Sequence, residues 1–119
     1  MKTFEVKTLY SHVEDCILCR DTYLDNNHIA LSVYSLSEGP FADITVNLSF
    51  TDTLPENCSF VDTNNFPEAE ALIARLGIGR PLGKTAISGF CSYPLYEFDT
   101  EAVDSYVRAT EESEDEYDW

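Results

Sequence analysis

The sequence predicts an α+β fold, in which an antiparallel sheet of four to five strands carries one packed helix and an acidic C-terminal helix or tail. Several short segments alternate between apolar and polar residues, which is typical of strands with one buried face. One segment, 66–76, has apolar residues at helical spacing and signals at both ends. Ten of the 22 acidic residues fall within 97–119, so acidic character is concentrated at the C-terminus.

The N-terminal half of the chain is predicted to be mostly strand. Residues 3–10 and 42–51 alternate between apolar and polar side chains, and residues 29–36 are β-like. The turn sequence Ser37–Pro40 lies between 29–36 and 42–51, which predicts that these two segments form an antiparallel hairpin. Residues 11–27 stay open between a short helix and an irregular crossing.

Residues 66–76 are predicted to form a helix that covers the sheet. Asn65 is placed as the N-cap and Glu68 follows three residues later, which is the spacing of a capping box. Pro67 lies in the first turn, where its missing N–H costs nothing, and Gly77 is placed to end the helix. The inward-facing apolar stripe consists of Ala69, Leu72, Ile73 and Leu76.

Two further strands are predicted around this helix. A short strand at 60–61 precedes it. A glycine-rich loop at 77–83 follows it and leads into an aromatic strand at 87–98. Pro94 indicates that this last strand is kinked or lies at an edge of the sheet.

A last helix is predicted after Asp99, whose side chain can accept hydrogen bonds from the first turn. Asp104 and Arg108 have the i, i+4 spacing of a helical ion pair. Acidic residues then crowd the negative end of the helix dipole, so the helix is expected to fray. We therefore expect a single α+β domain over 1–110 and an acidic tail over 111–119. The inner stripe of the helix consists of Val103, Tyr106, Val107 and Thr110.

The charge balance limits the classes of partner. The chain contains 22 acidic and 7 basic residues and has a formal net charge of −15. Contacts to phosphate need lysine and arginine, which argues against direct binding to nucleic acid or an anionic membrane. A basic partner, a cation or solubility alone remain. The N-terminus lacks the apolar region of a signal peptide and no apolar run reaches membrane-spanning length, so we expect a cytoplasmic protein with reduced cysteines.

No motif in the sequence predicts a catalytic, metal or cofactor site. Cys16 and Cys19 have C-x-x-C spacing, but a zinc site needs a second close pair of ligands and a redox motif needs a strand before it and a helix after it. Cys91, taken with a histidine, lacks the surroundings of a nucleophile. The loop at 77–83 follows a helix, whereas a phosphate-binding loop follows a strand. We expect no enzyme activity, no catalytic residue, no metal and no cofactor, and cysteines that pack as small apolar residues.

Two interpretations of the acidic C-terminus remain open. If residues 99–116 are helical, their carboxylates form a row with neighbours about 5–6 Å apart, which is comparable with the spacing of phosphates along a nucleic-acid strand. A basic channel that binds nucleic acid would accept such a row. The alternative is a solvated, disordered tail, as many acidic tails are.

The stretches 40–48, 54–65 and 88–98 contain the motifs Pro-Glu-Asn-Cys and Tyr-Pro-Leu-Tyr. Through these stretches the chain resembles, over about residues 29–98, a small acidic family of unknown function carried by conjugative elements and phages of gut bacteria. Residues 11–27 and the acidic tail fit the family poorly, and the resemblance implies no catalytic residues. Mobile elements carry small acidic proteins that block restriction and CRISPR nucleases, so the resemblance favours the interpretation as a nucleic-acid mimic.

We therefore expect a mobile-element-encoded inhibitor of a host defence nuclease, an anti-CRISPR or anti-restriction protein that acts in the bacterial host cell. As an acidic mimic it would bind the basic nucleic-acid-contacting surface of a nucleic-acid-binding protein such as an RNA-guided nuclease, and its tyrosines would contact arginines there. One alternative is a non-enzymatic accessory protein-interaction module of a mobile element, which would bind through the strand at 87–98. Another is a small enzyme or metal protein built on the cysteines. The expected partner-binding residues are Glu101, Asp104, Tyr106, Glu111, Glu112, Asp115, Glu116 and Tyr117.

Overall fold

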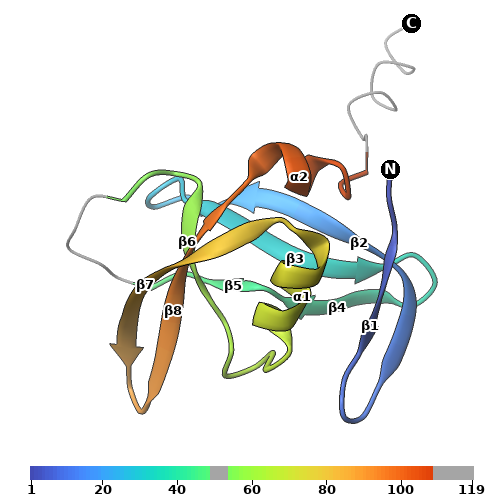
Figure 1. The fold of residues 1–119 in the computed structure, drawn as a ribbon, viewed down its shortest axis with the longest axis horizontal. Coiled ribbons are helices and arrows are strands. Elements are labelled where there is room, and N and C mark those ends of the chain that lie inside the picture. Colours follow the sequence, from blue (N-terminus) through green and yellow to red (C-terminus); the bar gives the residue numbers. More distant parts are fainter. Residues whose placement is uncertain (49–53, 109–119) are drawn as a thin grey trace, which may run out of the picture.

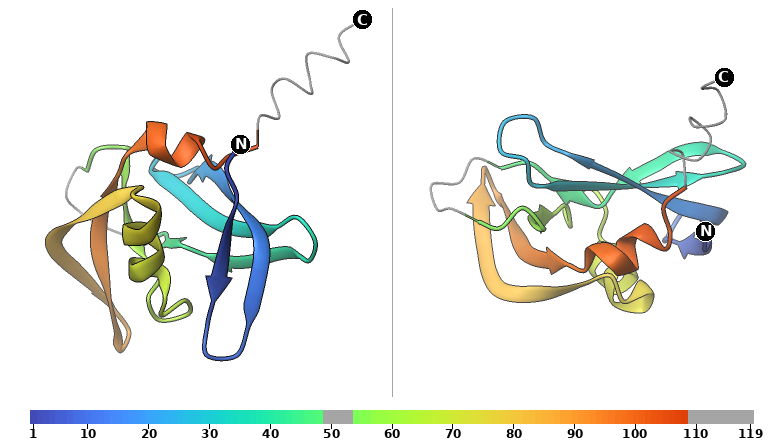
Figure 2. Two further views of the ribbon diagram at one scale, coloured as in Figure 1. Left: turned by 45° about the vertical axis from the view of Figure 1, so that its right-hand side comes forward. Right: turned by 90° about the horizontal axis from the view of Figure 1, so that it is seen from above.

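The computed structural model describes residues 1–48 and 54–108. Over these residues the chain forms two antiparallel four-stranded sheets and two short helices (Figure 1). Figure 2 shows the molecule from above, with the first sheet, in blue to teal, on one side and the yellow to orange strands of the second sheet on the other. This sheet-rich fold agrees broadly with the α+β prediction. The prediction of one sheet of four to five strands is wrong, because the strands divide between two sheets.

The first sheet consists of β1 (Phe4–Lys7), β2 (His12–Thr22), β3 (Ile29–Ser35) and β4 (Gly39–Asp43), paired in that order. Strand β2 occupies most of the 11–27 segment, for which the sequence left a helix or an irregular crossing open. Asp15 obscures the alternation of this strand, because it has a φ of 54° at a bulge in the pairing with β1. The bulge lets Val13 and Cys16 both face the core although they are three residues apart.

The second sheet consists of β5 (Thr45–Val46), β6 (Cys58–Val61), β7 (Gly79–Ser88) and β8 (Cys91–Phe98), in the order β5-β6-β8-β7. The short strand predicted before the helix is confirmed as part of β6. The loop predicted at 77–83 is wrong, because β7 begins at Gly79. Glycine suits this position because β8 passes close by: a Cβ atom here would meet the Glu97 carbonyl oxygen at 3.0 Å. An edge position for Pro94 is also wrong, because β8 lies between β6 and β7. The proline is tolerated there because the pairing with β6 ends at Leu95.

The single strand predicted at 42–51 is wrong, because the chain crosses from one sheet to the other at Ile44. Strand β4 precedes this residue and β5 follows it. Ile44 donates its N–H to the Leu31 carbonyl oxygen at 2.9 Å and accepts a hydrogen bond from the Asp62 N–H at 2.8 Å. Its side chain is completely buried, so one residue links both sheets and the core. The hairpin predicted across the Ser37–Pro40 turn is confirmed by the pairing of β3 with β4.

The predicted amphipathic helix is present as α1 (Ala69–Leu76), three residues shorter at its start than expected. Gly77 ends it in the left-handed conformation, with a φ of 69°, as predicted. The predicted cap is wrong, because the N-cap is Glu68 and makes no side-chain cap hydrogen bond. Asn65 instead donates two hydrogen bonds to the Asp62 carboxylate, in the turn before the helix. Asn65 is therefore engaged in that turn and does not cap the helix.

The helix predicted after Asp99 is present as α2 (Thr100–Asp104), a single turn of five residues. Its cap is confirmed, because the Asp99 carboxylate accepts hydrogen bonds from two N–H groups of the first turn at 3.1 and 3.2 Å. The chain then returns to the first sheet. The Tyr106 carbonyl oxygen accepts a hydrogen bond from the Leu18 N–H at 3.0 Å, and Val107 forms a parallel bridge with Leu18. This segment covers the edge of β2 beyond the point where its pairing with β1 ends.

One main hydrophobic core joins residues of both sheets and both helices. Helix α2 lies across the top of this core in the view of Figure 1. A smaller hydrophobic cluster is formed by side chains of β6 and β8 in the second sheet and consists of Cys58, Phe60, Tyr93 and Leu95. The most buried members of the main core include Val6, Leu18, Val33, Ile44, Ile73, Phe98 and Val103.

Candidate functional site

The expected partner-binding residues fall into three groups in the structure. Glu101 and Asp104 lie on α2 and have exposed side chains. Tyr106 lies just after this helix and is half-buried. Glu111, Glu112, Asp115, Glu116 and Tyr117 lie outside the described residues.

Asp104 is bound by a cation from a strand distant in sequence. Arg20 on β2 donates hydrogen bonds from Nη1 to both carboxylate oxygens of Asp104, at 2.7 and 2.8 Å. The predicted pair of Asp104 with Arg108 is therefore wrong. Helix α2 ends at Asp104, and the Arg108 guanidinium instead lies 6.0 Å from the centre of the Tyr34 ring. The Asp104 side chain remains 55% exposed, so its pair with Arg20 leaves it accessible from outside.

Tyr106 is engaged within the molecule. Its ring packs edge-to-face against Phe4, with ring centres 5.6 Å apart. The Lys2 ammonium lies 5.5 Å from the centre of the same ring. Tyr106 thus joins the N-terminal segment to the segment after α2, and an arginine of a partner would have to displace Lys2 to stack on this ring.

The fold adds acidic residues from the first half of the chain to those of α2. The strand register places Asp21 and Asp43 on the two flanks of β3, opposite Ala30 and Ser32. Asp25 lies in the turn that joins β2 to β3. Helix α2 packs on β2, where Arg20 holds Asp104; the Arg20 side chain leaves the strand on the face opposite to that of Asp21. We call the exposed residues Asp21, Asp25, Asp43, Glu101 and Asp104 the acidic rim.

Sequence reasoning missed three members of the acidic rim. No spacing relates Asp21, Asp25 and Asp43 to one another or to α2, because only the pairing of β2, β3 and β4 brings them together. The signal that was present is their position, since each lies in a turn or close to the end of a strand. Aspartate is common at such positions for its own local hydrogen bonding, so the signal does not by itself indicate a site.

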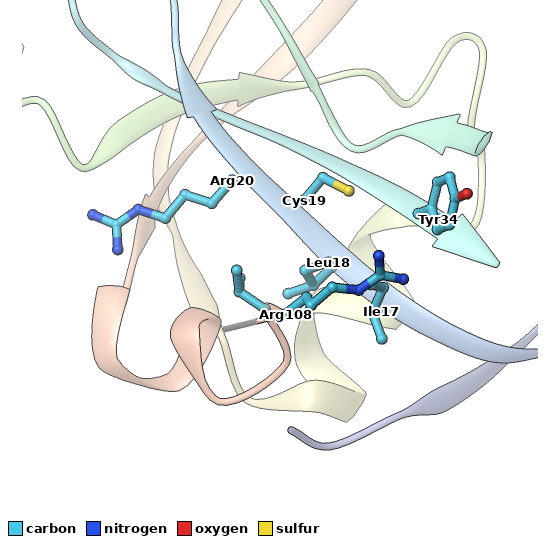
Figure 3. A pocket seen from close by; sticks show the side chains of 7 residues that line it. Ile17, Leu18, Cys19, Arg20, Tyr34 and Arg108 are labelled. Atoms are coloured by element: carbon cyan, nitrogen blue, oxygen red, sulfur yellow. The ribbon is translucent and has the colours of Figure 1, made fainter. Parts of the chain in front are cut away.

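A hollow of about 390 Å³ lies beside the acidic rim, between β2, β3 and the segment that follows α2 (Figure 3). The Arg108 side chain extends toward Tyr34, whereas Arg20 points away from the hollow, toward its partner Asp104. Apolar side chains from β2 and from Val107 form much of the wall. The hollow is therefore suited to receive an apolar side chain of a partner that contacts the rim. It is lined by Ile17, Leu18, Cys19, Arg20, Tyr34, Val107 and Arg108.

The C-x-x-C pair cannot act as a unit. Residues three apart in a regular strand face opposite sides of the sheet, and accordingly Cys16 is buried in the core whereas Cys19 is exposed beside the hollow. Burial raises the pKa of the Cys16 thiol and of the Cys58 thiol, which keeps both protonated. Two sulfurs on opposite faces of one strand neither form a disulfide nor share a metal ion.

Glu5, His12 and Glu14 are the described residues whose side chains could together hold a metal ion. Their ligand atoms lie within 4.8 Å of one another on the β1–β2 ribbon. His12 Nε2 lies 2.8 Å from Glu5 Oε2, and this hydrogen bond is the main reason why the pKa of Glu5 is lowered. The nearby Lys7 also lowers this pKa and would repel a cation. Sequence spacing did not indicate the group, because it joins two strands across a turn.

One family model matches most of the chain. It is described as a domain of unknown function (DUF4313), and it matches residues 18–118. The resemblance to a family of unknown function is thereby confirmed. The match extends beyond residues 29–98 at both ends and includes part of 11–27 and most of the acidic tail. No curated protein and no solved structure matches the chain. Within the described residues, no helix is long and apolar enough to cross a membrane.

Proposed function

This chain belongs to the DUF4313 family, and we propose that it is a non-enzymatic inhibitor of a host defence nuclease, encoded by a conjugative element or phage of gut bacteria. It acts in the cytoplasm of the host cell, where it occupies a basic surface through which the nuclease contacts DNA or RNA. The acidic rim supplies the part of the mimicking charge that lies within the described residues. The six acidic residues after position 110 extend it.

The observation that carries the proposal is the exposure of the acidic rim. All five rim carboxylates are exposed, and among the described residues only Asp104 of these five forms an ion pair. Like charges on one molecule repel each other, which opposes folding and is relieved when a cationic surface binds. A protein with a net charge of −15 and such a surface is suited to a basic partner.

The inhibition follows from competition for the same cations. A nuclease holds the nucleic-acid backbone with lysine and arginine, and release of counterions contributes much of that affinity. A carboxylate surface that reaches these residues first prevents the nucleic acid from binding. The hollow beside the rim adds a contact that a bare polyanion does not make, because an apolar side chain of the nuclease can enter it.

Affinity capture from a host lysate tests the proposal. The full-length chain is immobilised, and bound proteins are identified by mass spectrometry at about 0.1 M and about 1 M salt, where the Debye length is about 10 Å and about 3 Å. We expect a DNA- or RNA-cleaving enzyme that is retained at low salt, released at high salt and displaced by duplex DNA. A salt-resistant partner that duplex DNA does not displace would instead favour an accessory protein-interaction module.

The Arg20–Asp104 pair offers two matched variants for the captured enzyme. Arg20→Ala and Asp104→Asn each remove the same ion pair, but the first makes the net charge more negative and the second makes it less negative. If charge drives association, Arg20→Ala binds faster than wild type and Asp104→Asn binds more slowly. If both variants change the association rate equally and in the same direction, the placement of α2 by the ion pair matters for binding and the charge at these positions does not.

The acidic tail is tested separately by truncation. A chain that ends after Thr110 lacks six of the 22 acidic residues. It is expected to inhibit the captured nuclease less than the full-length chain does, mainly through slower association. Undiminished inhibition by the truncated chain would limit the mimic to the acidic rim.

A further inference from the structure

The stretch 71–96, which includes most of the hairpin of β7 and β8, differs in charge from the rest of the molecule. Residues 71–96 contain three basic residues, Arg75, Arg80 and Lys84, and no acidic residue. All 22 acidic residues lie in the remainder of the chain, which has only four basic residues. We call residues 82–95, the outer part of the hairpin, the arm.

The arm ends in two exposed apolar side chains. A two-residue turn, Gly89-Phe90, joins the strands, and Gly89 has a φ of 64°. The Phe90 side chain is fully exposed and that of Ile87 is 78% exposed. Figure 1 shows the tip projecting away from α1 at the lower left. Burial of apolar side chains of this size is favourable, so a partner that covers the tip gains free energy.

The outer edge of the arm has unpaired backbone groups. Strand β7 is an edge strand, and within the described residues it pairs only with β8. Pro81 and the register shift between Pro81 and Thr85 interrupt the edge near the body of the protein. From Thr85 to Ser88 the pairing is regular and the strand has no charge and no proline. In an antiparallel ladder, residue pairs that exchange hydrogen bonds alternate with pairs that do not. The pair next to a two-residue turn, here Ser88 with Cys91, is hydrogen-bonded. Ile87 and Thr85 therefore direct their backbone N–H and C=O groups away from β8.

We propose that two copies of this chain dimerise through their arms, with β7 of one copy antiparallel to β7 of the other about a twofold axis. The two second sheets then form one continuous eight-stranded sheet. An antiparallel pair of identical strands is self-complementary, which a twofold interface requires. The dimer pairs the free edge of each β7 and buries Ile87 and Phe90 of each copy against the other arm.

Charge favours a second copy as the occupant. Two molecules with a net charge of −15 repel each other, and contact between their acidic rims would bring that repulsion to short range. Residues 82–95 contain no acidic residue, so contact between two arms places no carboxylate of either arm in the interface. In the view of Figure 1, α2 lies at the top and the tip of the arm at the bottom.

Sedimentation equilibrium of the full-length chain tests the dimer. We expect a monomer–dimer equilibrium that shifts toward dimer when salt is raised from about 0.1 M to about 1 M, because salt screens the repulsion between the two acidic bodies. Binding of the proposed nuclease has the opposite salt dependence, so the two proposals can fail separately. The proposal is overturned if the chain stays monomeric at both salt concentrations up to about 1 mM protein. The Kd of a dimer would then exceed about 1 mM, which corresponds to a dissociation free energy below about 4 kcal/mol.

Two lysine variants with the same net charge locate the interface. Ile87→Lys places a charge on the edge of the arm, whereas Leu24→Lys places it on a side chain that is 99% exposed in the β2–β3 turn. We expect Ile87→Lys to weaken the dimer by about tenfold or more and Leu24→Lys to leave it unchanged. Both positions are exposed, so circular dichroism should show wild-type folding for both. A dimer as tight in Ile87→Lys as in wild type would place the interface elsewhere.

Discussion

The Arg20 guanidinium of β2 donates two hydrogen bonds to the Asp104 carboxylate of α2, across 84 residues of sequence. The pair joins the last helix to the first sheet at the margin of the acidic rim. Both side chains are partly exposed, at 36% and 55%, so water screens the pair and it stabilises the fold only modestly. Arg20→Ala and Asp104→Asn should each lower the free energy of unfolding by about 0.2–1 kcal/mol, measured by urea denaturation. A loss of several kcal/mol in either variant would contradict this assignment.

Thr45 stabilises the point where the chain leaves the first sheet. Its buried Oγ1 accepts a hydrogen bond from the Leu31 N–H at 3.0 Å and lies 2.8 Å from the Tyr23 hydroxyl. Thr45→Val leaves that N–H without its acceptor and should cost about 1–3 kcal/mol of stability in chemical denaturation. Thr45→Ser keeps the oxygen and loses one methyl group, so it should cost about 0.8 kcal/mol. Equal stability of the two variants would argue against this role of the hydroxyl.

Tyr96 makes the fold sensitive to high pH. Burial raises the pKa of Tyr96 to about 12, and its hydrogen bond to Glu70, at 2.6 Å, acts in the same direction. An unfolded tyrosine ionises near about 10, so the folded state holds this proton more tightly. The contribution is therefore fully present below about pH 10 and is lost as the pH rises toward about 12. Tyr96→Phe should lose less stability than wild type over this interval, whereas parallel pH profiles would refute the assignment.

The four cysteines should differ in reactivity according to their burial. Cys19 is exposed, whereas Cys16 and Cys58 are buried and have thiol pKa values raised by burial. A thiol-alkylating reagent should modify Cys19 first in the folded protein and should reach the two buried cysteines only on unfolding. Peptide mapping by mass spectrometry measures the order. Modification of Cys16 in the folded protein as fast as Cys19, or an oxidised Cys16–Cys19 pair, would contradict their placement on opposite faces of β2.

Local signals predicted local features correctly. The end of α1 at Gly77 and the cap of α2 at Asp99 depend on the conformational preference of one residue and on hydrogen bonds within one turn. The hairpin of β3 and β4 depends on alternation and on the turn between the strands. Local reasoning failed where one residue was suited to two roles. Asn65 has a good spacing for a cap, but its amide and N–H bind Asp62 in the preceding turn.

The candidate site was only partly predictable for the same reason. The charge of α2 could be predicted, because Glu101 and Asp104 lie close together in sequence. The other rim residues, Asp21, Asp25 and Asp43, could not, because only the pairing of β2, β3 and β4 places them around the first sheet. The choice of Arg20 over Arg108 as partner of Asp104 likewise depends on where α2 packs.

The sequence by itself determined the charge of −15, the concentration of acidic residues at the C-terminus, the helix that ends at Gly77 and the acid-free stretch 71–96. Composition, caps and periodicity are properties of residues close together in the chain, so no tertiary information is needed to read them. Only the tertiary structure decided that 42–51 divides at Ile44 between two sheets, that Arg20 holds Asp104, and that the arm presents a free edge. These features depend on pairing between distant segments, where many alternatives satisfy the same local pattern and burial of a common core selects one of them.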